Sequence, residues 1–307
     1  MAYPVAATHP QLSGSYIPIV FASLLVVEFY SVTVLAEISN TDYQGDIKDQ
    51  GDTVRIRTLP DISINDYVKG QALNYQTPAP SYVELLIDKG KYIGIAINDL
   101  DRLQSDIEYQ TKWSQHGAEK MKIEVDKGVL QDIYDDVHAD NTGNAAGKES
   151  GDINLGVSGT PFAFTSTNSV DKIVDCSTVL DEQNVPESER FIVLPPWACA
   201  RIKTSELKDA SLTRDGSSTL RSGKVGMVDR FTIYSSNNLK KTADGGGSTA
   251  WSGVFGQKSA LTFALQLTKN ETLRNPNDFG DLMRSLMVYG YKVVKSEALG
   301  HLYVDKA

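Results

Sequence analysis

The sequence predicts a mixed α+β fold in which a middle domain is inserted into a second one. Three observations lead to this prediction. Apolar residues alternate with a period of two on both sides of residues 61–80, helical composition continues over residues 106–138, and further strand patterns follow toward the C-terminus. Strands at both ends of a chain, with helices and strands between them, are typical of such an arrangement.

Composition limits the classes of function. The chain has 307 residues, 41% of them hydrophobic and 22% charged, which is ordinary for a globular protein. A net charge of -9 argues against a nucleic-acid reader, because phosphate neutralisation needs clustered Lys and Arg. We therefore expect only weak, non-specific contact with DNA, from cations such as Lys48 or Arg102. Cys176 and Cys199 are too few for a disulfide framework and are expected in the core.

The N-terminal segment is apolar. Residues 1–27 contain no Asp, Glu, Lys or Arg, and residues 17–27 are nearly all apolar. A signal peptide needs a basic first region, and a membrane span needs about 20 apolar residues, whereas Glu28 interrupts this run. We therefore expect no membrane segment, but a helix over residues 16–38 that is buried against neighbours.

Residues 52–97 predict a very long β-arm. Apolar residues follow a period of two over 54–58, 83–87 and 93–97. Between these runs, residues 61–80 are rich in Asp, Asn, Gly and Pro, which opposes a packed helix. As a hairpin, each limb reaches roughly 40 Å at about 3.3 Å per residue. A compact chain of this length has a radius of gyration of only about 19 Å, so the arm needs another subunit to cover it.

A long helix is predicted after the arm. Ser105 and Glu108 have the spacing of a capping box, and helical composition then continues to about His138, roughly 48 Å of helix. Its apolar residues recur every four positions, so the apolar stripe drifts round the helix and no single face stays buried. We expect a strut that crosses between packing partners. The stripe consists of Tyr109, Trp113, Gly117, Met121, Val125, Val129, Ile133 and Val137.

The rest of the chain alternates helix and strand patterns. A helix is predicted over residues 169–183, and a short buried strand over 191–194 is closed by two prolines. Further strands are predicted over 225–234, 261–267, 286–294 and 301–304.

No catalytic, cofactor or metal site is predicted. The four histidines lack zinc-type spacing, residues 156–160 lack the final Gly of a nucleophile elbow, and residues 247–249 lack the Lys of a phosphate-binding loop. The best paired carboxylates are Asp135 with Asp136 and Asp99 with Asp101. Charged residues beside a helix are usually solvated, so we do not expect them to be catalytic.

Short segments in a fixed order carry a family resemblance. They are NTDYQG (40–45), GDTV (51–54), LDE (180–182), FIVLPP (191–196), SNN (236–238), QKSA (257–260) and FGD (279–281). Together with the order of the elements, over residues 16–307, this series resembles the major capsid proteins of tailed bacteriophages, which have the Hong Kong 97-like capsid fold.

The resemblance implies a domain organisation and partners. It implies an N-terminal arm over 1–45, an extended E-loop over 52–88, a peripheral domain over 89–160 and 271–307 with a spine helix over 106–138, and an axial domain over 161–270. Copies of the chain are expected to form hexamers and pentamers in a virion capsid that is assembled in the bacterial cytoplasm. Family members with a built-in scaffold carry a long N-terminal extension, so a separate scaffolding protein is expected here, with a portal and, where one is encoded, a decoration protein.

The predicted function is a structural one. We expect a non-enzymatic shell subunit that encloses double-stranded DNA, and alternatives are an encapsulin-type nanocompartment shell and a β-rich hydrolase that uses acidic residues. Subunit contacts are expected at Arg55, Arg57, Tyr67 and Lys69 of the arm, and at Leu24 and Val27 of the N-terminal segment.

Overall fold

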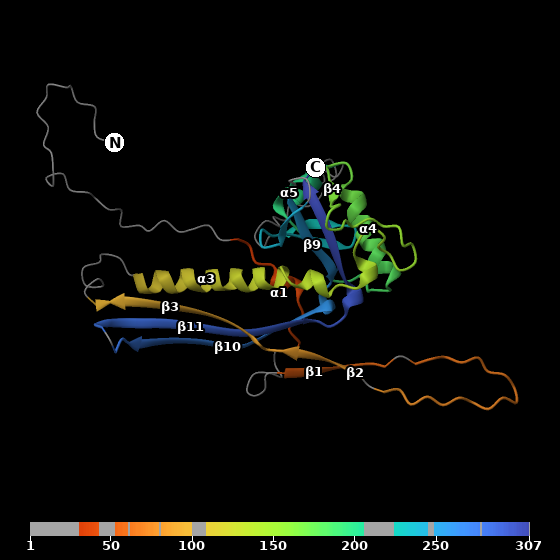
Figure 1. Cartoon of the computed structure of the whole chain (residues 1–307), viewed down its shortest axis with the longest axis horizontal. Helices are drawn as coiled ribbons and strands as arrows, with labels where there is room; N and C mark the ends of the chain where they lie inside the picture. The colour runs from red at the N-terminus through yellow and green to blue at the C-terminus, as the bar shows by residue number, and fades with distance from the viewer. Residues whose placement is uncertain are drawn as a thin grey trace, which may run out of the picture.

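The computed structural model describes residues 31–42, 53–60, 62–79, 81–99, 109–205, 224–244, 249–276 and 278–306. In this part of the chain the strands form a seven-stranded, a three-stranded and a two-stranded sheet. A long helix, α3, joins the first two sheets, and the two-stranded sheet continues into a projecting arm (Figure 1). The predicted α+β class is confirmed.

The seven-stranded sheet is built round a fully buried central strand, β5 (Arg190–Leu194). It pairs in parallel with β7 (Phe231–Ser235) and antiparallel with β9 (Thr249–Gln257). Residues 225–234, predicted as one strand, form two, because Asp229 has φ 53° and turns the chain back between them. The other strands are β4 (Phe162–Phe164), β6 (Lys224–Val228), β8 (Lys241–Ala243) and β12 (Leu299–Lys306).

Two helices, α4 (Ser169–Glu182) and α5 (Pro196–Lys203), contribute to the core beside this sheet. The predicted helix over 169–183 and the predicted strand over 191–194 are therefore confirmed. Cys176 and Cys199 are buried and free, as expected, and burial raises the pKa of Cys199 to about 11.

The three-stranded sheet is antiparallel, in the order β10 (Leu261–Arg274), β11 (Gly280–Val293) and β3 (Lys89–Asn98). Alternation over 93–97 was assigned to the arm, and this was wrong. Strand β3 pairs with β11, not with the arm, because a period of two identifies a strand but not its partner.

Helix α3 (Tyr109–Leu130) ends eight residues earlier than the predicted His138. The backbone N–H of Asp132 donates to Val129 O, three residues back instead of the four of an α-helix. Two short 3-10 helices follow, η2 (Ile133–Asp136) and η3 (Ala139–Asn141). The tighter turns let Ile133 enter the main core while the chain changes direction. The predicted start at residues 105–108 lies outside the described residues.

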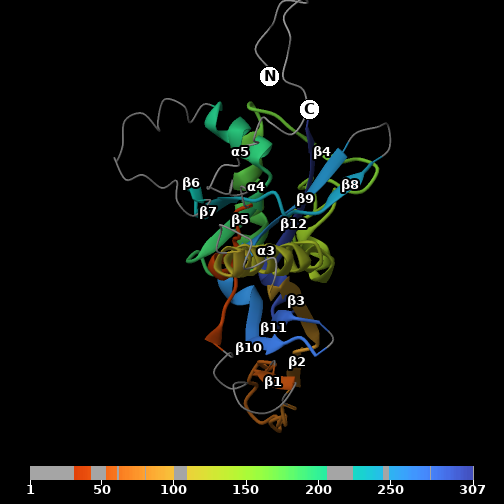
Figure 2. The ribbon, with the colours of Figure 1, turned by 90° about the vertical axis from the view of Figure 1, so that its left-hand side faces the viewer.

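The strut prediction for α3 is confirmed. Toward its N-terminal end, Gly117 faces the side chain of Ile93 on the three-stranded sheet. Toward its C-terminal end, Val125 and Val129 belong to the core cluster that includes the seven-stranded sheet. The drifting stripe thus contacts one sheet and then the other. Figure 2 shows α3 lying between the two sheets.

The described N-terminal residues cross α3. Only α1 (Leu35–Ile38) is helical, and residues 31–34 are not, so the prediction of a helix over 16–38 is wrong there; Leu24 and Val27 lie outside the described residues. Asp126 of α3 accepts hydrogen bonds from the backbone N–H groups of Val34 and Leu35, both at 2.9 Å. Burial raises the pKa of the Asp126 carboxyl even though these bonds favour its charged form.

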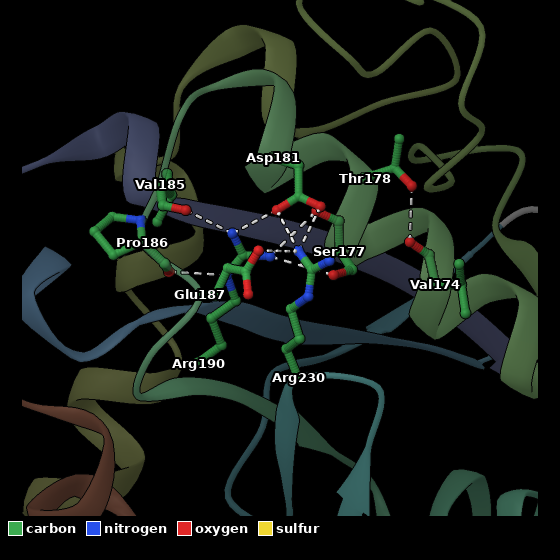
Figure 3. Close-up of polar contacts among 9 residues, drawn as sticks. All are labelled: Val174, Ser177, Thr178, Asp181, Val185, Pro186, Glu187, Arg190 and Arg230. Carbon is green, nitrogen blue, oxygen red and sulfur yellow. Dashed lines mark hydrogen bonds and ion pairs between the residues drawn. The ribbon is translucent and has the colours of Figure 1, made fainter.

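A buried arginine fixes the turn into β5. The side chain of Arg190 is fully enclosed, and it donates to Asp181 at 2.7 Å and to the carbonyl oxygens of Val185, Pro186 and Ser177 (Figure 3). Arg230 reaches the same Asp181 carboxylate from the β6–β7 turn. Every guanidinium nitrogen of Arg190 therefore has a partner, which satisfies a charge that is costly to bury alone.

Among the described helices, none is both long and apolar enough to cross a membrane.

Candidate assembly surface

The arm is one hairpin with one register. Its root is the six-residue pairing of β1 (Thr53–Thr58) with β2 (Ser81–Leu86), in which Thr53 faces Leu86 and Thr58 faces Ser81. The distal limbs, from Leu59 outward, project away from both larger sheets (Figure 1). The predicted projecting arm is thus present. Among the described residues of the arm, the β-ladder is confined to the root.

The tip of the arm is a tight turn. Gln71 N donates to Val68 O at 3.1 Å, and Gly70 has φ 90°. A positive φ at the third residue is the requirement of a type II turn, which Gly meets without steric cost. Lys69 therefore occupies the outermost turn, about 33 Å along the limb from Leu59 at roughly 3.3 Å per residue.

A side chain joins the two limbs between the root and the tip. Ser63 N donates to Gln76 Oε1 at 3.1 Å, and Gln76 Nε2 donates to Ser63 O at 2.9 Å. These two bonds copy the paired bonds that two opposed residues of an antiparallel ladder exchange. We call this contact the amide clasp.

The root of the arm is anchored to the three-stranded sheet. Ile56, Leu85 and Ile87 form a small buried cluster with Ala264 of β10. A Cβ atom at Gly290 of β11 would lie 2.1 Å from Leu86 O, so the backbone of β2 packs directly on this glycine. The arm therefore leaves the body in a fixed direction.

The opposite side of the root is polar and exposed. Arg55 donates to Glu84 at 3.0 Å and lies over the ring of Tyr82, with its guanidinium carbon 4.9 Å from the ring centroid. Arg57 is also exposed and faces Tyr82 in the ladder. These two predicted contact residues thus lie together, away from the subunit's own core.

Large apolar side chains are exposed along the distal arm. Leu59 is 98% exposed, Ile64 97% and Tyr75 86%. Apolar surface concentrated in this way marks an interaction site on a soluble protein. Only Tyr67 among these residues was predicted from the sequence, because composition does not reveal which side chains remain uncovered. The others are Ile62, Val68 and Leu73.

A second uncovered surface lies on the three-stranded sheet, on the side opposite α3. In the register of β3 and β11, Tyr92 faces Leu286 and Ala96 faces Leu282. Tyr92 is 81% exposed, and a Cβ atom at Gly94 would meet nothing within 4 Å. We call this surface the open sheet face; it comprises Tyr92, Gly94, Ala96, Leu273, Leu282 and Leu286. The sequence pattern that points to this surface is the placement of the small residues Gly94 and Ala96 between Ile93, Ile95 and Ile97.

One member of each predicted acidic pair forms an ion pair. Asp99 pairs with Arg274, and Asp136 pairs with Lys292 at 3.3 Å; Asp101 lies outside the described residues. Ser158 lies in a turn closed between Val157 and Thr160. Within the described ranges, no three His, Cys, Asp or Glu residues are grouped as metal ligands.

Comparison with known proteins gives a consistent result for the fold. No family model matches the chain, and no curated protein matches it. A solved structure from Mycobacterium phage Che8 has a TM-score of 0.74 and 26% identity, over 94% of this chain and 97% of that one. The capsid structure of Cyanophage P-SCSP1u has a TM-score of 0.70 and 17% identity, over 95% and 94%. The capsid of Ralstonia phage GP4 has a TM-score of 0.62 and 14% identity, over 98% of both chains.

Nearly the whole chain thus has the fold of these phage structures. Each of these matches spans at least 94% of the chain.

Proposed function

We infer that the chain is a major capsid protein of a tailed bacteriophage, which assembles with other copies of itself into the icosahedral shell around a double-stranded DNA genome. The observation that carries this inference is the match of almost the whole chain to solved phage structures, two of which are named as capsids. The exposed arm supplies the physical reason for self-association, because its apolar side chains lie beyond the reach of the subunit's own core.

The arm of one copy seats on the open sheet face of a neighbour. Both surfaces combine apolar side chains with exposed tyrosines, Tyr75 on the arm and Tyr92 on the sheet. Aromatic residues give large contact areas at low entropic cost, which is why they are enriched at interfaces. One such contact is modest, but it repeats at every subunit of a symmetric shell.

The predicted contact residues are assigned on this basis. Arg55 and Arg57 contact the neighbour from the polar side of the arm root, Tyr67 adds apolar area near the tip, and Lys69 pairs with a neighbour's carboxylate. Leu24 and Val27 of the N-terminal arm, over residues 1–45, bury apolar surface on another copy.

Domain names follow from the sheets. The three-stranded sheet with α3 forms the peripheral domain, and the seven-stranded sheet forms the axial domain round hexamer and pentamer axes. Strand β12 pairs with β9, and β10 begins at Leu261, so we propose that the C-terminal strand belongs to the axial domain and all of β10 to the peripheral domain. The E-loop corresponds to the β1–β2 hairpin.

Further partners follow from the inferred role. Assembly takes place in the cytoplasm of a bacterial host, with a separate scaffolding protein to control curvature and a portal at one vertex. A decoration protein binds the outer surface where the phage encodes one.

The two alternatives are not favoured. The solved structures described above come from phages, two of them named as capsids, rather than from nanocompartments or hydrolases. The ion pairs of Asp99 and Asp136 are what is usual for exposed carboxylates with a structural role, and they support the shell subunit over the hydrolase.

Expression of the chain in bacteria followed by negative-stain microscopy tests the function. Closed shells or curved sheets are expected. The double variant Leu59→Ser, Ile64→Ser should form far fewer shells, whereas the matched control Val174→Ser, which changes an exposed apolar residue of α4, should assemble normally. Discrete monomers of the unmodified chain, in the presence of its scaffolding protein, contradict the inferred function.

A further inference from the structure

One side of α3 carries a row of lysines. At 100° per residue, Lys112, Lys120 and Lys127 fall within about 80° of one another, and they lie opposite Met121 and Val125, which are buried. All three lysines are exposed. We call these three residues the lysine row.

The charge of this helix departs from the charge of the chain. The charged side chains of α3 that reach solvent are four Lys against two Glu, whereas the whole chain has a net charge of -9. One of the glutamates, Glu119, already binds Lys122 at 2.8 Å, to one side of the lysine row. The only Asp of α3, Asp126, is buried and accepts hydrogen bonds from Val34, Leu35 and Asn238.

The other side of the three-stranded sheet has a different electrostatic character. There Glu271 pairs with both Lys269 and Arg284, so its carboxylate offsets part of their positive charge. The two sides of this layer therefore differ in their balance of charge. The exposed side of α3 carries four lysines against Glu119 and Glu124, whereas on the open sheet face Glu271 is paired with two cations.

Building on the proposed function, we propose that the lysine row contacts the phosphates of packaged duplex DNA, so that this side of α3 faces the shell interior. Along the helix axis, Lys112 and Lys120 are about 12 Å apart and Lys120 and Lys127 about 10.5 Å, so the row spans roughly 22 Å of a duplex surface. Lysine is a flexible point charge that contacts phosphate without reading bases. Binding is thus independent of sequence, sensitive to salt, and weak for each subunit.

The test compares two charge-matched triple variants of the full-length chain. One is Lys112→Gln, Lys120→Gln, Lys127→Gln; the control is Lys148→Gln, Lys203→Gln, Lys241→Gln, three exposed lysines outside α3. Fluorescence anisotropy with a short labelled duplex is recorded over a range of salt concentrations. The lysine-row variant should reduce the slope of log affinity against log salt by about 2.7, at about 0.9 for each phosphate that is no longer neutralised. The control should leave the slope unchanged.

A gain-of-function variant guards against loss of folding. Glu119→Gln removes the partner of Lys122 beside the lysine row, so DNA binding should become tighter. Equal weakening by both triple variants, an unchanged slope in the lysine-row variant, or a strong sequence preference overturns the inference. Shell formation is scored separately by microscopy: a lysine-row variant that forms shells yet binds DNA like the unmodified chain refutes this inference alone, whereas absence of shells from the unmodified chain refutes the proposed function.

Discussion

Gln76 and Ser63 face each other across the arm. The side-chain amide of Gln76 accepts a hydrogen bond from the backbone N–H of Ser63 and donates one to the backbone carbonyl oxygen of Ser63. Their positions continue the register of the root, in which Thr53 faces Leu86, and of the tip, where Val68 bonds Gln71. The amide clasp therefore holds the limbs in one register across a stretch in which apolar side chains point into solvent.

Replacing Gln76 by Ala should loosen the arm without unfolding the subunit. Both bonds of the clasp disappear, but each exposed bond contributes only about 1 kcal/mol, and the core does not depend on it. Hydrogen exchange at the Ser63 amide should become faster, and shell yield should fall. The control is Gln115→Ala, which changes an exposed side chain of α3. An equal effect of the two variants on exchange at Ser63 and on shell yield contradicts the role of the clasp.

Deletion of residues 62–80 should leave a folded subunit that no longer forms stable shells. The deleted limbs contribute nothing to the buried clusters of the described residues, but they carry most of the exposed apolar side chains of the arm. Circular dichroism should report an unchanged thermal transition, and sedimentation should report unassembled subunits. Closed shells of ordinary stability from this variant show that the arm is dispensable.

Lys69 should act through its charge and not through a covalent bond. An exposed lysine amine is a poor nucleophile without a neighbouring base or a desolvated site, and Lys69 lies exposed at the tip of the arm. On denaturing electrophoresis, mature particles should therefore give a monomer band. Lys69→Glu should weaken assembly, whereas Lys69→Arg should preserve it. A ladder of multimers that Lys69→Ala abolishes points instead to cross-linking.

His301 should make the subunit sensitive to acid. Its Nδ1 lies 3.3 Å from Thr142 Oγ1, its Nε2 is enclosed, and burial lowers its pKa to about 4. Because the folded-state pKa is below the unfolded value of 6.5, the stability from a neutral His301 is complete above pH 6.5 and is lost as pH falls toward 4. At 1.36 kcal/mol per pKa unit, this loss is at most about 3.4 kcal/mol.

Urea denaturation of dissociated subunits between pH 7 and pH 4 measures this loss directly. His301→Gln keeps a polar side chain but cannot titrate, so the pH dependence of its free energy of unfolding should be flatter than that of the unmodified chain. Identical pH profiles for the two proteins remove His301 as the cause.

Arg190→Met should destabilise the subunit by about 3–5 kcal/mol, because three carbonyl oxygens and the Asp181 carboxylate lose a buried donor. Arg190→Lys keeps the charge but has fewer donors and no planar fork, so it should be intermediate. Arg230→Met removes the more exposed partner of Asp181 and should cost far less. Chemical denaturation of the three variants gives the order, and equal losses contradict the role assigned to Arg190.

The strands and the strut were predictable because their signals are local. A period of two and a drifting four-residue stripe are visible in the sequence alone, and β5, α4 and the course of α3 agree with them. Pairing is not local, so β3 was assigned to the arm instead of to β11. The end of α3 was placed eight residues too late because helical composition does not distinguish an α-helix from the 3-10 turns that follow Leu130.

The assembly surface was predictable only in outline. Residues 61–80 indicated an arm, and its residue types indicated a need for partners. The amide clasp was not predictable, because the contact of Gln76 with Ser63 depends on a register that the turn at Lys69 and Gly70 sets. The open sheet face was not predictable either, because its exposure depends on which side of the three-stranded sheet α3 covers.

The direct packing of Leu86 on Gly290 has a mechanical consequence. No side chain lies between these two backbones, so little compressible material separates the arm from β11. A pull on Lys69 by a neighbour is therefore carried into the hydrogen-bonded strands of the three-stranded sheet, along their length. In a shell under pressure from a confined genome, tension on the arm therefore reaches the three-stranded sheet through the contact of its root with Gly290, and substitution of Gly290 by Ala should soften the shell before it unfolds the subunit.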